Sequence, residues 1–206
     1  MADKSHWENV YGRRAIDDVS WYQEHATRSR DLITRLGVGP DDPIIDVGGG
    51  ASVLVDDLLD VGHRDLTVLD LSAAALAAAR TRLGRRADAV RWIEGDATCA
   101  PLPAGRYALW HDRAVFHFLT GTEERAAYVR QVLHAVRPGG HVIVATFAED
   151  GPTECSGLPV MRYDAAHLHA EFGASFALLG HEREVHITPG GRDQAFVYCF
   201  CRRLPC

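Results

Sequence analysis

The stretch Pro43–Gly50, with the sequence PIIDVGGG, decides the fold of this chain. Its apolar residues Ile44, Ile45 and Val47 are β-branched, a type that favours extended strands, and they indicate a strand buried on both faces. The glycines from Gly48 to Gly50 follow at once, and glycine permits backbone angles and close ligand contacts that other residues exclude. The stretch therefore predicts a central strand that ends in a ligand-binding turn.

Strand and helix patterns alternate on the C-terminal side of this stretch. Such alternation indicates parallel strands joined by crossover helices, as in a Rossmann-like, doubly wound α/β sheet. The first predicted strand is 43–47, the next strands are 66–70, 90–94, 107–111 and 141–147, and the helices are 52–61, 72–83 and 122–136.

The segments before and after these alternating strands and helices have patterns of their own. Residues 1–40 carry aromatic and aliphatic side chains at helical spacing, which predicts an N-terminal helical cap of two helices. Residues 41–148 are predicted to form the ligand-binding core, and residues 149–206 a long loop, a helix and an antiparallel hairpin that turns at 188–193. The hairpin completes a seven-stranded, mostly parallel sheet with helices on both faces, and we expect residues 1–206 to form a single domain.

The composition excludes several classes of protein. A net charge of -6 over 206 residues provides no basic surface for nucleic acid. No apolar run approaches the ~20 residues that cross a bilayer, and no hydrophobic signal segment opens the chain, so we expect a cytoplasmic protein with no membrane partner. The five cysteines are too scattered for a disulfide framework, and we assign no metal to the eleven histidines. All basic residues except Lys4 are arginines, a bias typical of GC-rich bacterial genes.

The spacing of the glycines separates two kinds of ligand. Dinucleotide-binding dehydrogenases carry the pattern G-x-G-x-x-G, and here Val53 occupies the position of the third glycine. Instead, Asp46 stands two positions before Gly48, and Gly49 and Gly50 complete the turn. The pattern therefore disfavours an NAD-linked oxidoreductase.

Four motifs in one order give the chain a resemblance to a known family. The run 46–50 (DVGGG) is similar to the first motif of the class I S-adenosylmethionine-dependent methyltransferases. The runs 68–72 (VLDLS) and 94–97 (EGDA) resemble the ends of the family's second and third strands, and 137–140 (RPGG) resembles the turn before its fifth strand. The resemblance spans residues 43–147, and it implies S-adenosyl-L-methionine as the cofactor and S-adenosyl-L-homocysteine as the product.

The resemblance also implies a cofactor contact for residues at the ends of these strands, besides the glycine turn itself. Asp70 would accept hydrogen bonds from both ribose hydroxyls, because an ionised carboxylate offers several lone pairs. Asp96 would accept from the adenine amino group, Ala97 would leave room for the ring, and Leu71 would cover one of its faces. Asp46 would hold the amino-acid part of the cofactor. Each motif alone also has a structural explanation, such as Asp70 beginning a helix cap.

The residues after the fourth predicted strand border the methyl-transfer site in this family. We expect Asp112 to contact the cofactor and the acceptor, and His117 to take a proton from the acceptor, because an unperturbed histidine has a pKa near ~6.5. Alternatively, His117 packs on a helix and Asp112 caps it. His111 is expected to be structural. Methyl transfer from a sulfonium needs little beyond alignment, so the reaction does not require a base.

The N-terminal segment supplies candidate substrate contacts. Trp21 and Tyr22, together with Trp7 and Tyr11, would fold over the site as an aromatic lid attracted by the positive sulfur of the cofactor. Alternatively, these rings anchor the N-terminal helices in the core.

The loop 148–162 is long for a compact domain and lies where this family places substrate-binding elements. At its end, Arg162 is a candidate partner for a substrate carboxylate. Cys155 is a candidate soft ligand, with a buried structural thiol as the alternative.

The leading functional hypothesis is methyl transfer to a nitrogen, oxygen or sulfur atom of a small-molecule acceptor. A protein-lysine methyltransferase is the second, because Trp7-x-x-x-Tyr11 and Ser20–Tyr22 are similar to the start of certain enzymes of that kind. A non-catalytic protein that binds S-adenosylmethionine is the third, since one fold hosts several functions. The sequence identifies neither the acceptor nor the oligomeric state.

Overall fold

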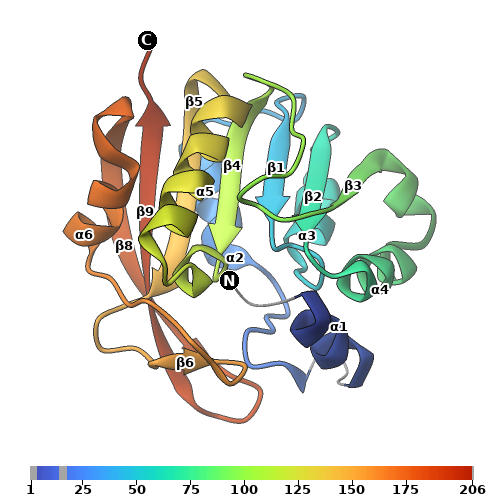
Figure 1. The fold of residues 1–206 in the computed structure, drawn as a ribbon. Helices are drawn as coiled ribbons and strands as arrows, with labels where there is room; N and C mark the ends of the chain where they lie inside the picture. The colour runs from blue at the N-terminus through green and yellow to red at the C-terminus, as the bar shows by residue number, and fades with distance from the viewer. Residues whose placement is uncertain (1–3, 14–17, 206) are drawn as a thin grey trace.

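The computed structural model describes residues 4–13 and 18–205 (Figure 1). Its centre is a seven-stranded sheet with the strand order β3-β2-β1-β4-β5-β9-β8. The strands from β3 to β5 are parallel, and β9 and β8 are antiparallel, which confirms the predicted mixed sheet. In sheet order the strands are β3 (Val90–Glu94), β2 (Leu66–Asp70), β1 (Ile44–Val47), β4 (Tyr107–Arg113), β5 (Val136–Phe147), β9 (Asp193–Arg203) and β8 (Phe176–Ile187).

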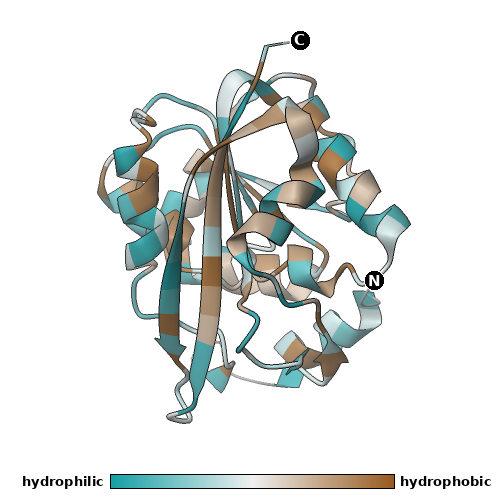
Figure 2. Ribbon diagram, turned by 90° about the vertical axis from the view of Figure 1, so that its left-hand side faces the viewer, coloured by the Kyte–Doolittle hydropathy of each residue, from teal (hydrophilic) through white to brown (hydrophobic). Residues whose placement is uncertain are grey.

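Helices cover both faces of the sheet, as Figure 1 and the turned view of Figure 2 show. One hydrophobic core lies under α5 and α6, and a second lies under α2, α3 and α4. The helices are α1 (Lys4–Arg13), α2 (Thr27–Arg35), α3 (Leu54–Asp60), α4 (Ala73–Leu83), α5 (Thr122–Ala135) and α6 (Ala165–Phe172), and short 3-10 turns lie at Gly84–Ala89, Phe116–Phe118 and Gly173–Ser175.

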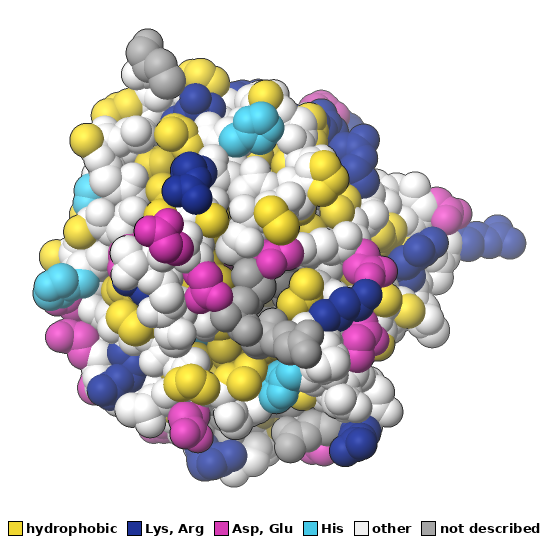
Figure 3. All heavy atoms as spheres, viewed as in Figure 1, with side chains coloured by type: hydrophobic (Ala, Val, Ile, Leu, Met, Phe, Trp, Pro, Cys, Tyr) yellow, Lys and Arg dark blue, Asp and Glu magenta, His cyan; other side chains and the backbone are white. Residues whose placement is uncertain are grey.

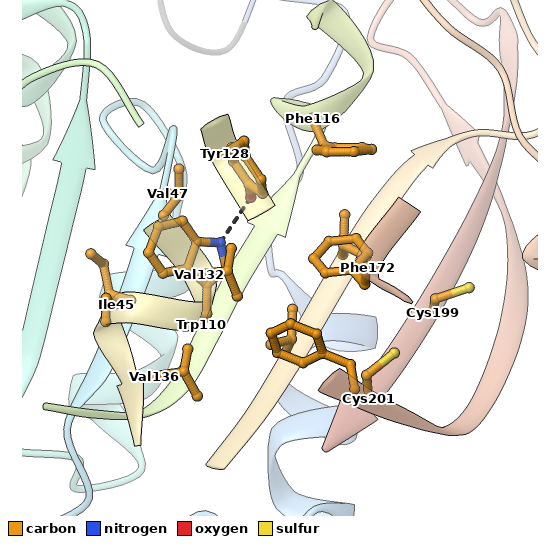
Figure 4. Packing of buried hydrophobic residues seen from close by; sticks show 14 of the residues in the cluster. Ile45, Val47, Trp110, Phe116, Tyr128, Val132, Val136, Phe172, Cys199 and Cys201 are labelled. Atoms are coloured by element: carbon orange, nitrogen blue, oxygen red, sulfur yellow. Dashed lines mark hydrogen bonds between the residues drawn. The ribbon is translucent and has the colours of Figure 1, made fainter. Parts of the chain in front are cut away.

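The central strand β1 is buried along its whole length because it pairs with β2 on one side and β4 on the other. Its side chains alternate between the two cores, as strand geometry requires. Ile45 and Val47 face the core under α5 and α6, where Figure 4 shows them beside Trp110, and Ile44 faces the opposite core. A strand that is apolar on both faces can occupy only such a central place.

A buried polar network crosses the core under α5. The indole Nε1–H of Trp110 donates to the hydroxyl of Tyr128 at 2.8 Å (Figure 4), and that hydroxyl donates to Asp112 Oδ2 at 2.5 Å. All three side chains belong to residues that are 0% exposed. The network ties α5 to the end of β4 and so fixes the direction in which the chain leaves that strand.

The C-terminal ends of the parallel strands meet at one edge of the sheet, at the bottom of Figure 1. Helix α1 lies below this edge, and so does the small hairpin formed by β6 (Glu154–Cys155) and β7 (Leu158–Pro159). The two segments come from opposite ends of the chain. Open α/β sheets bind their ligands along such an edge.

The edge strand β8 and its neighbour β9 differ in character. Figure 2 shows β8 as largely hydrophilic and β9 as largely hydrophobic. Cys199 and Cys201 lie on one face of β9 and are fully buried in the core that includes α6. Their position accords with a packing role.

Several predicted boundaries differ from the structure, and the strand predicted at 107–111 extends to Arg113. The turn predicted at 137–140 belongs to β5, because Val136 still pairs with Tyr107 before the register shifts at Leu109. Helix α3 begins at Leu54 instead of residue 52, since the Ser52 hydroxyl accepts the amide of Leu54 in a tight turn. The loop predicted at 148–162 contains the β6–β7 hairpin.

The surface shows mixed charge. On the face seen in Figure 3, Lys and Arg side chains are scattered among Asp and Glu side chains and do not gather over one element. Among the described residues, no helix is both long and apolar enough to cross a membrane.

Replacing Tyr128 by phenylalanine tests the polar network. The change leaves the Trp110 indole and the Asp112 carboxylate without a shared partner, and an unsatisfied buried group costs about 1–3 kcal/mol. We expect the free energy of unfolding, measured by urea denaturation, to fall by that amount. Tyr107→Phe is the matched control, because among the described residues the hydroxyl of this equally buried tyrosine makes one long hydrogen bond, of 3.5 Å, to Thr67. Equal losses in the two variants would contradict a special role for the network.

Candidate active site

A cavity of about 820 Å³, part of it open to solvent, lies at the C-terminal edge of the sheet. Its walls come from the turn after β1, the ends of β2, β3 and β4, helix α1, the segment around Trp21, and Cys155 of β6. A second cavity of about 520 Å³ adjoins it, and Trp21, Val47, Gly48 and Arg113 line both.

The glycine turn leaves this space open because its residues lack side chains. Gly48 has a φ of +69°, and a Cβ atom there would lie 2.0 Å from Val115 Cγ2. A Cβ atom on Gly49 would lie 2.2 Å from Asp46 Oδ2. Such distances are impossible, so only glycine fits at either position. The close packing of Val115 and Asp46 against this turn therefore requires glycine at both positions.

Asp70 ends β2 and lines the larger cavity. Its two carboxylate oxygens accept the backbone amides of Gly50 at 2.9 Å and Ser72 at 2.8 Å. Each oxygen keeps a lone pair for a further donor. Burial raises the pKa of Asp70 to about 6. The helix cap that the sequence left open as an alternative is supplied by Ser72, whose hydroxyl accepts the amide of Ala75 at 3.1 Å.

The remaining residues predicted to surround adenine lie on the same wall. Leu71, Asp96 and Ala97 all line the larger cavity. Asp96 is held in place because its Oδ1 accepts both the amide of Thr98 at 2.8 Å and its hydroxyl at 2.7 Å. The structure thus brings together the candidates from the ends of β2 and β3.

Asp46 lies in the second cavity within a buried chain of hydrogen bonds. Its Oδ1 is 2.7 Å from Nδ1 of His111, and Nε2 of His111 is 2.8 Å from the hydroxyl of Ser29 on α2. Asp46 Oδ2 is buried and has no hydrogen-bond partner in the described part of the chain. A buried carboxylate oxygen without a donor is costly, so this atom marks a place where a ligand donor would be favourable.

Aromatic side chains from the N-terminal segment cover the larger cavity. Trp7 contacts the rings of Tyr11, Trp21 and Phe118, with ring centroids 6.2, 5.9 and 5.1 Å away. All four line the cavity. Tyr22 lines the second cavity. The aromatic rings predicted to form a lid therefore pack together with Phe118, a residue that the sequence did not point to.

Cys155 also reaches the larger cavity, in a buried position. Burial raises the pKa of its thiol to about 12, so the sulfur is protonated at neutral pH. A protonated thiol is a weak nucleophile and a poor metal ligand. Cys155 therefore contributes an apolar, polarisable wall.

Asp112 does not face either cavity, contrary to its predicted contacts with cofactor and acceptor. Its Oδ1 accepts the amide of Val115 at 2.9 Å, and its Oδ2 accepts the amide of Phe116 at 3.0 Å and the Tyr128 hydroxyl. Burial raises the pKa of Asp112 to about 6. The carboxylate caps the 3-10 turn Phe116–Phe118, as the alternative interpretation held.

His117 is likewise outside the residues that line the two cavities, contrary to its predicted contact with the acceptor. Its ring packs on Phe118 and Phe147, and its Nδ1 accepts the amide of Phe147 at 3.4 Å. Burial lowers its pKa to about 3, which makes it a poor proton acceptor at neutral pH. Arg162 is exposed and donates to the carbonyl of Gly151 at 3.2 Å, away from both cavities.

Arg113 is a site residue that sequence reasoning missed. It follows Asp112 directly and ends β4, and it lines both cavities. Because side chains alternate along a strand, it shares a face with His111, while Asp112 points to α5. That alternation is the signal that could have revealed it.

Comparisons with known proteins agree with this geometry. Residues 44–140 match the family described as "Methyltransferase domain". The eEF1A lysine and N-terminal methyltransferase of Danio rerio is 25% identical over 153 residues, a match that covers 73% of this chain and 22% of that protein. The chain thus spans about a fifth of the length of this curated relative.

Solved structures share the fold across nearly the whole chain. A SAM-dependent methyltransferase from Anabaena variabilis has a TM-score of 0.74 at 14% identity, and the match covers 98% of this chain and 96% of that chain. The 1,6-didemethyltoxoflavin-N1-methyltransferase of Burkholderia thailandensis, solved with 1,6-didemethyltoxoflavin and S-adenosylhomocysteine, has a TM-score of 0.70 at 18% identity, covering 98% and 84%.

Fold, strand order and strand-end residues together define the class I S-adenosylmethionine-dependent methyltransferase fold. Over residues 44–140, the chain is similar to the methyltransferase domain family.

His117→Asn tests whether this histidine is structural. The unfolded chain binds a proton on His117 below its ordinary pKa of about 6.5, whereas the folded protein does so only below about 3. Stability from this residue is therefore present above pH 6.5 and is lost as the pH falls, by about 2 kcal/mol between pH 7 and pH 5.

The asparagine variant does not titrate, so its free energy of unfolding should depend less on pH by that amount. His181→Asn, at an exposed position of β8, is the control and should keep the pH dependence of the parent. An unchanged pH dependence in His117→Asn would contradict the buried neutral state. The measurement is urea denaturation at both pH values.

Proposed function

We propose that this chain transfers a methyl group from S-adenosyl-L-methionine to a nitrogen, oxygen or sulfur atom of a small-molecule acceptor. One observation carries the proposal: Asp70, Leu71 and Asp96 line a single cavity whose remaining wall includes several aromatic side chains. A cofactor against the first three residues and an acceptor against the aromatic side chains would lie side by side. Such proximity supplies much of the rate enhancement for a transfer of this kind.

The residues present fit the cofactor that the family implies. The Asp70 carboxylate has lone pairs to accept two ribose hydroxyls. Ala97 is small enough to leave room for a planar ring, and Leu71 offers an apolar surface for its face. The unpartnered Asp46 Oδ2 is suited to an ammonium group, since a charge-assisted bond would satisfy a buried oxygen.

The side chains around the cavity would exclude water and orient the cofactor, and the proposed transfer uses no general base. When bound, the cofactor supplies a methyl group on a positively charged sulfur, which leaves as a neutral thioether. The rings of Trp7, Tyr11 and Trp21 exclude water and offer aromatic faces that favour positive charge. His111 holds the Asp46 carboxylate through Nδ1. The proton of the acceptor passes to solvent.

A compact acceptor suits the aromatic cover. The rings of Trp7 and Trp21 pack against each other edge to face over the cavity, which restricts the space available to an acceptor. A protein lysine is the second candidate acceptor. It is favoured by the similarity of the chain to the eEF1A lysine and N-terminal methyltransferase of Danio rerio.

A panel assay distinguishes these functions. Purified protein is incubated with labelled S-adenosylmethionine and thiols, amines, phenols or a bacterial lysate proteome, and release of S-adenosylhomocysteine is measured. The proposal expects label in a small molecule. Label found only in protein would favour the lysine candidate, and cofactor binding without any transfer would favour a non-catalytic protein.

Asp70→Asn tests the proposed cofactor wall. Loss of the charged acceptor should weaken binding of S-adenosylmethionine about 10- to 100-fold, measured by calorimetry, because charge-assisted hydrogen bonds contribute about 1.5–3 kcal/mol. Asp65→Asn is the matched control, since Asp65 precedes the opposite end of β2 and pairs with Arg106 at 2.6 Å. Equal affinity in the Asp70 variant and the parent would contradict the assigned contact.

A further inference from the structure

Arg113 carries a positive charge into the site. It is the only Lys or Arg among the described residues that line the two cavities, and its side chain is 10% exposed. A buried charge is costly unless hydrogen bonds and opposite charges surround it. The partners of the guanidinium therefore indicate what this group can bind.

Protein groups accept hydrogen bonds from only some of the N–H donors of the Arg113 guanidinium. Its Nε donates to the Tyr198 hydroxyl at 3.0 Å, and its Nη1 lies at a long 3.5 Å from the carbonyl of Trp21. Nη2 is buried and has no hydrogen-bond partner in the described residues. Glu184 Oε2 lies 3.7 Å from Nη2, close enough for an ion pair but not for a hydrogen bond. The edge formed by Nη1 and Nη2, which binds carboxylates in bidentate fashion, thus has unused donors.

The guanidinium is also held in one place. It stacks on the ring of Phe196 at 4.3 Å from the ring centroid. The Tyr198 hydroxyl that accepts its Nε–H donates in turn to Glu184 Oε2 at 2.9 Å. A group fixed in this way loses little conformational entropy when it binds a ligand.

The guanidinium could pair with the carboxylate of the cofactor or with a carboxylate of the acceptor, and the position of its protein partners bears on this choice. Phe196 and Tyr198 belong to β9 and Glu184 to β8, beyond β5 in the strand order. Asp70 and the proposed cofactor wall lie on the other side of β4, at the ends of β2 and β3. The protein partners of the guanidinium therefore lie across β4 from Asp70, and Arg113 also lines the second cavity together with Asp46.

Apolar side chains line the larger cavity together with Arg113. They include Trp7, Trp21, Phe118 and Cys155. Such walls accept an apolar or aromatic body, and one charged group among them fixes its orientation.

We propose that Arg113 forms an anion-binding subsite and that the methyl acceptor is a small, apolar or aromatic organic acid whose carboxylate pairs with the guanidinium. This inference rests on the proposed function, because it names the class of acceptor for that site. The acid body lies against the aromatic rings and directs its nucleophilic atom toward the cofactor wall.

Matched probe pairs test the subsite by binding, independently of turnover. The pairs are 4-mercaptobenzoate with 4-mercaptobenzamide and 4-hydroxybenzoate with 4-hydroxybenzamide, titrated into protein saturated with S-adenosylhomocysteine. We expect each acid to bind at least about 10-fold more tightly than its amide. Arg113→Gln should abolish this preference and leave the affinity for S-adenosylmethionine unchanged.

Glu184→Gln provides a second variant that keeps the test decisive if Arg113→Gln fails to fold. It removes the anion beside Nη2 and retains an acceptor for the Tyr198 hydroxyl. The acids should then bind about 3-fold or more tightly than they bind the parent, because the guanidinium is no longer partly neutralised.

Each remaining outcome contradicts the inference. Equal binding of acid and amide, no binding of either, or unaltered acid binding in Glu184→Gln would overturn it. Weaker binding of S-adenosylmethionine in Arg113→Gln, with the acid preference kept, would assign the guanidinium to the cofactor carboxylate instead. Acid binding without methyl transfer to any acceptor would contradict the proposed function alone, and transfer without acid preference would contradict the subsite alone.

Discussion

The parallel register of β1 with β2 and β4 is the constraint on which the rest of the structure depends. Val47 pairs with Leu69 on one side and Asp112 on the other, so the three strands end at one level. The chain must turn there without a side chain, because any Cβ on Gly48 would overlap Val115. The polar residues that follow the strands then gather around the space that the turn leaves open.

The sequence was sufficient to predict the part of the site at the ends of the central strands, where the strand pattern gives the positions and the family resemblance gives the expected cofactor contacts. The apolar run 44–47, with its glycine turn, indicated a central strand, and the strand ends at Asp70 and Asp96 followed from the alternation of strands and helices. Asp70 is the last residue of β2 and Asp96 follows the end of β3 by two residues, so their location depends mainly on the direction of these parallel strands. Their arrangement around one cavity follows from the parallel topology.

Side-chain direction at the end of β4 could not be predicted, because it depends on partners distant in the sequence. Asp112 turns to Tyr128 of α5, and His117 is enclosed by Phe147 of β5. Adjacent positions along a strand face opposite sides, so Arg113 lines both cavities, whereas Asp112, which the family resemblance placed at the site, does not. The partners of Arg113 come from β8 and β9, and no local pattern connects them to it.

The hydrogen bond from Ser29 to His111 has a consequence for how the two N-terminal helices are attached. Helix α2 is fastened by this buried contact and by three buried residues, whereas α1 has none buried among its described residues. Lifting α2 would break the buried contact of Ser29, while lifting α1 would separate aromatic rings, the Lys4–Glu94 ion pair and the hydrogen bond from the Ala73 amide to Glu8. Of the two helices, α1 is therefore attached with less burial at the edge of the sheet where the cavity lies.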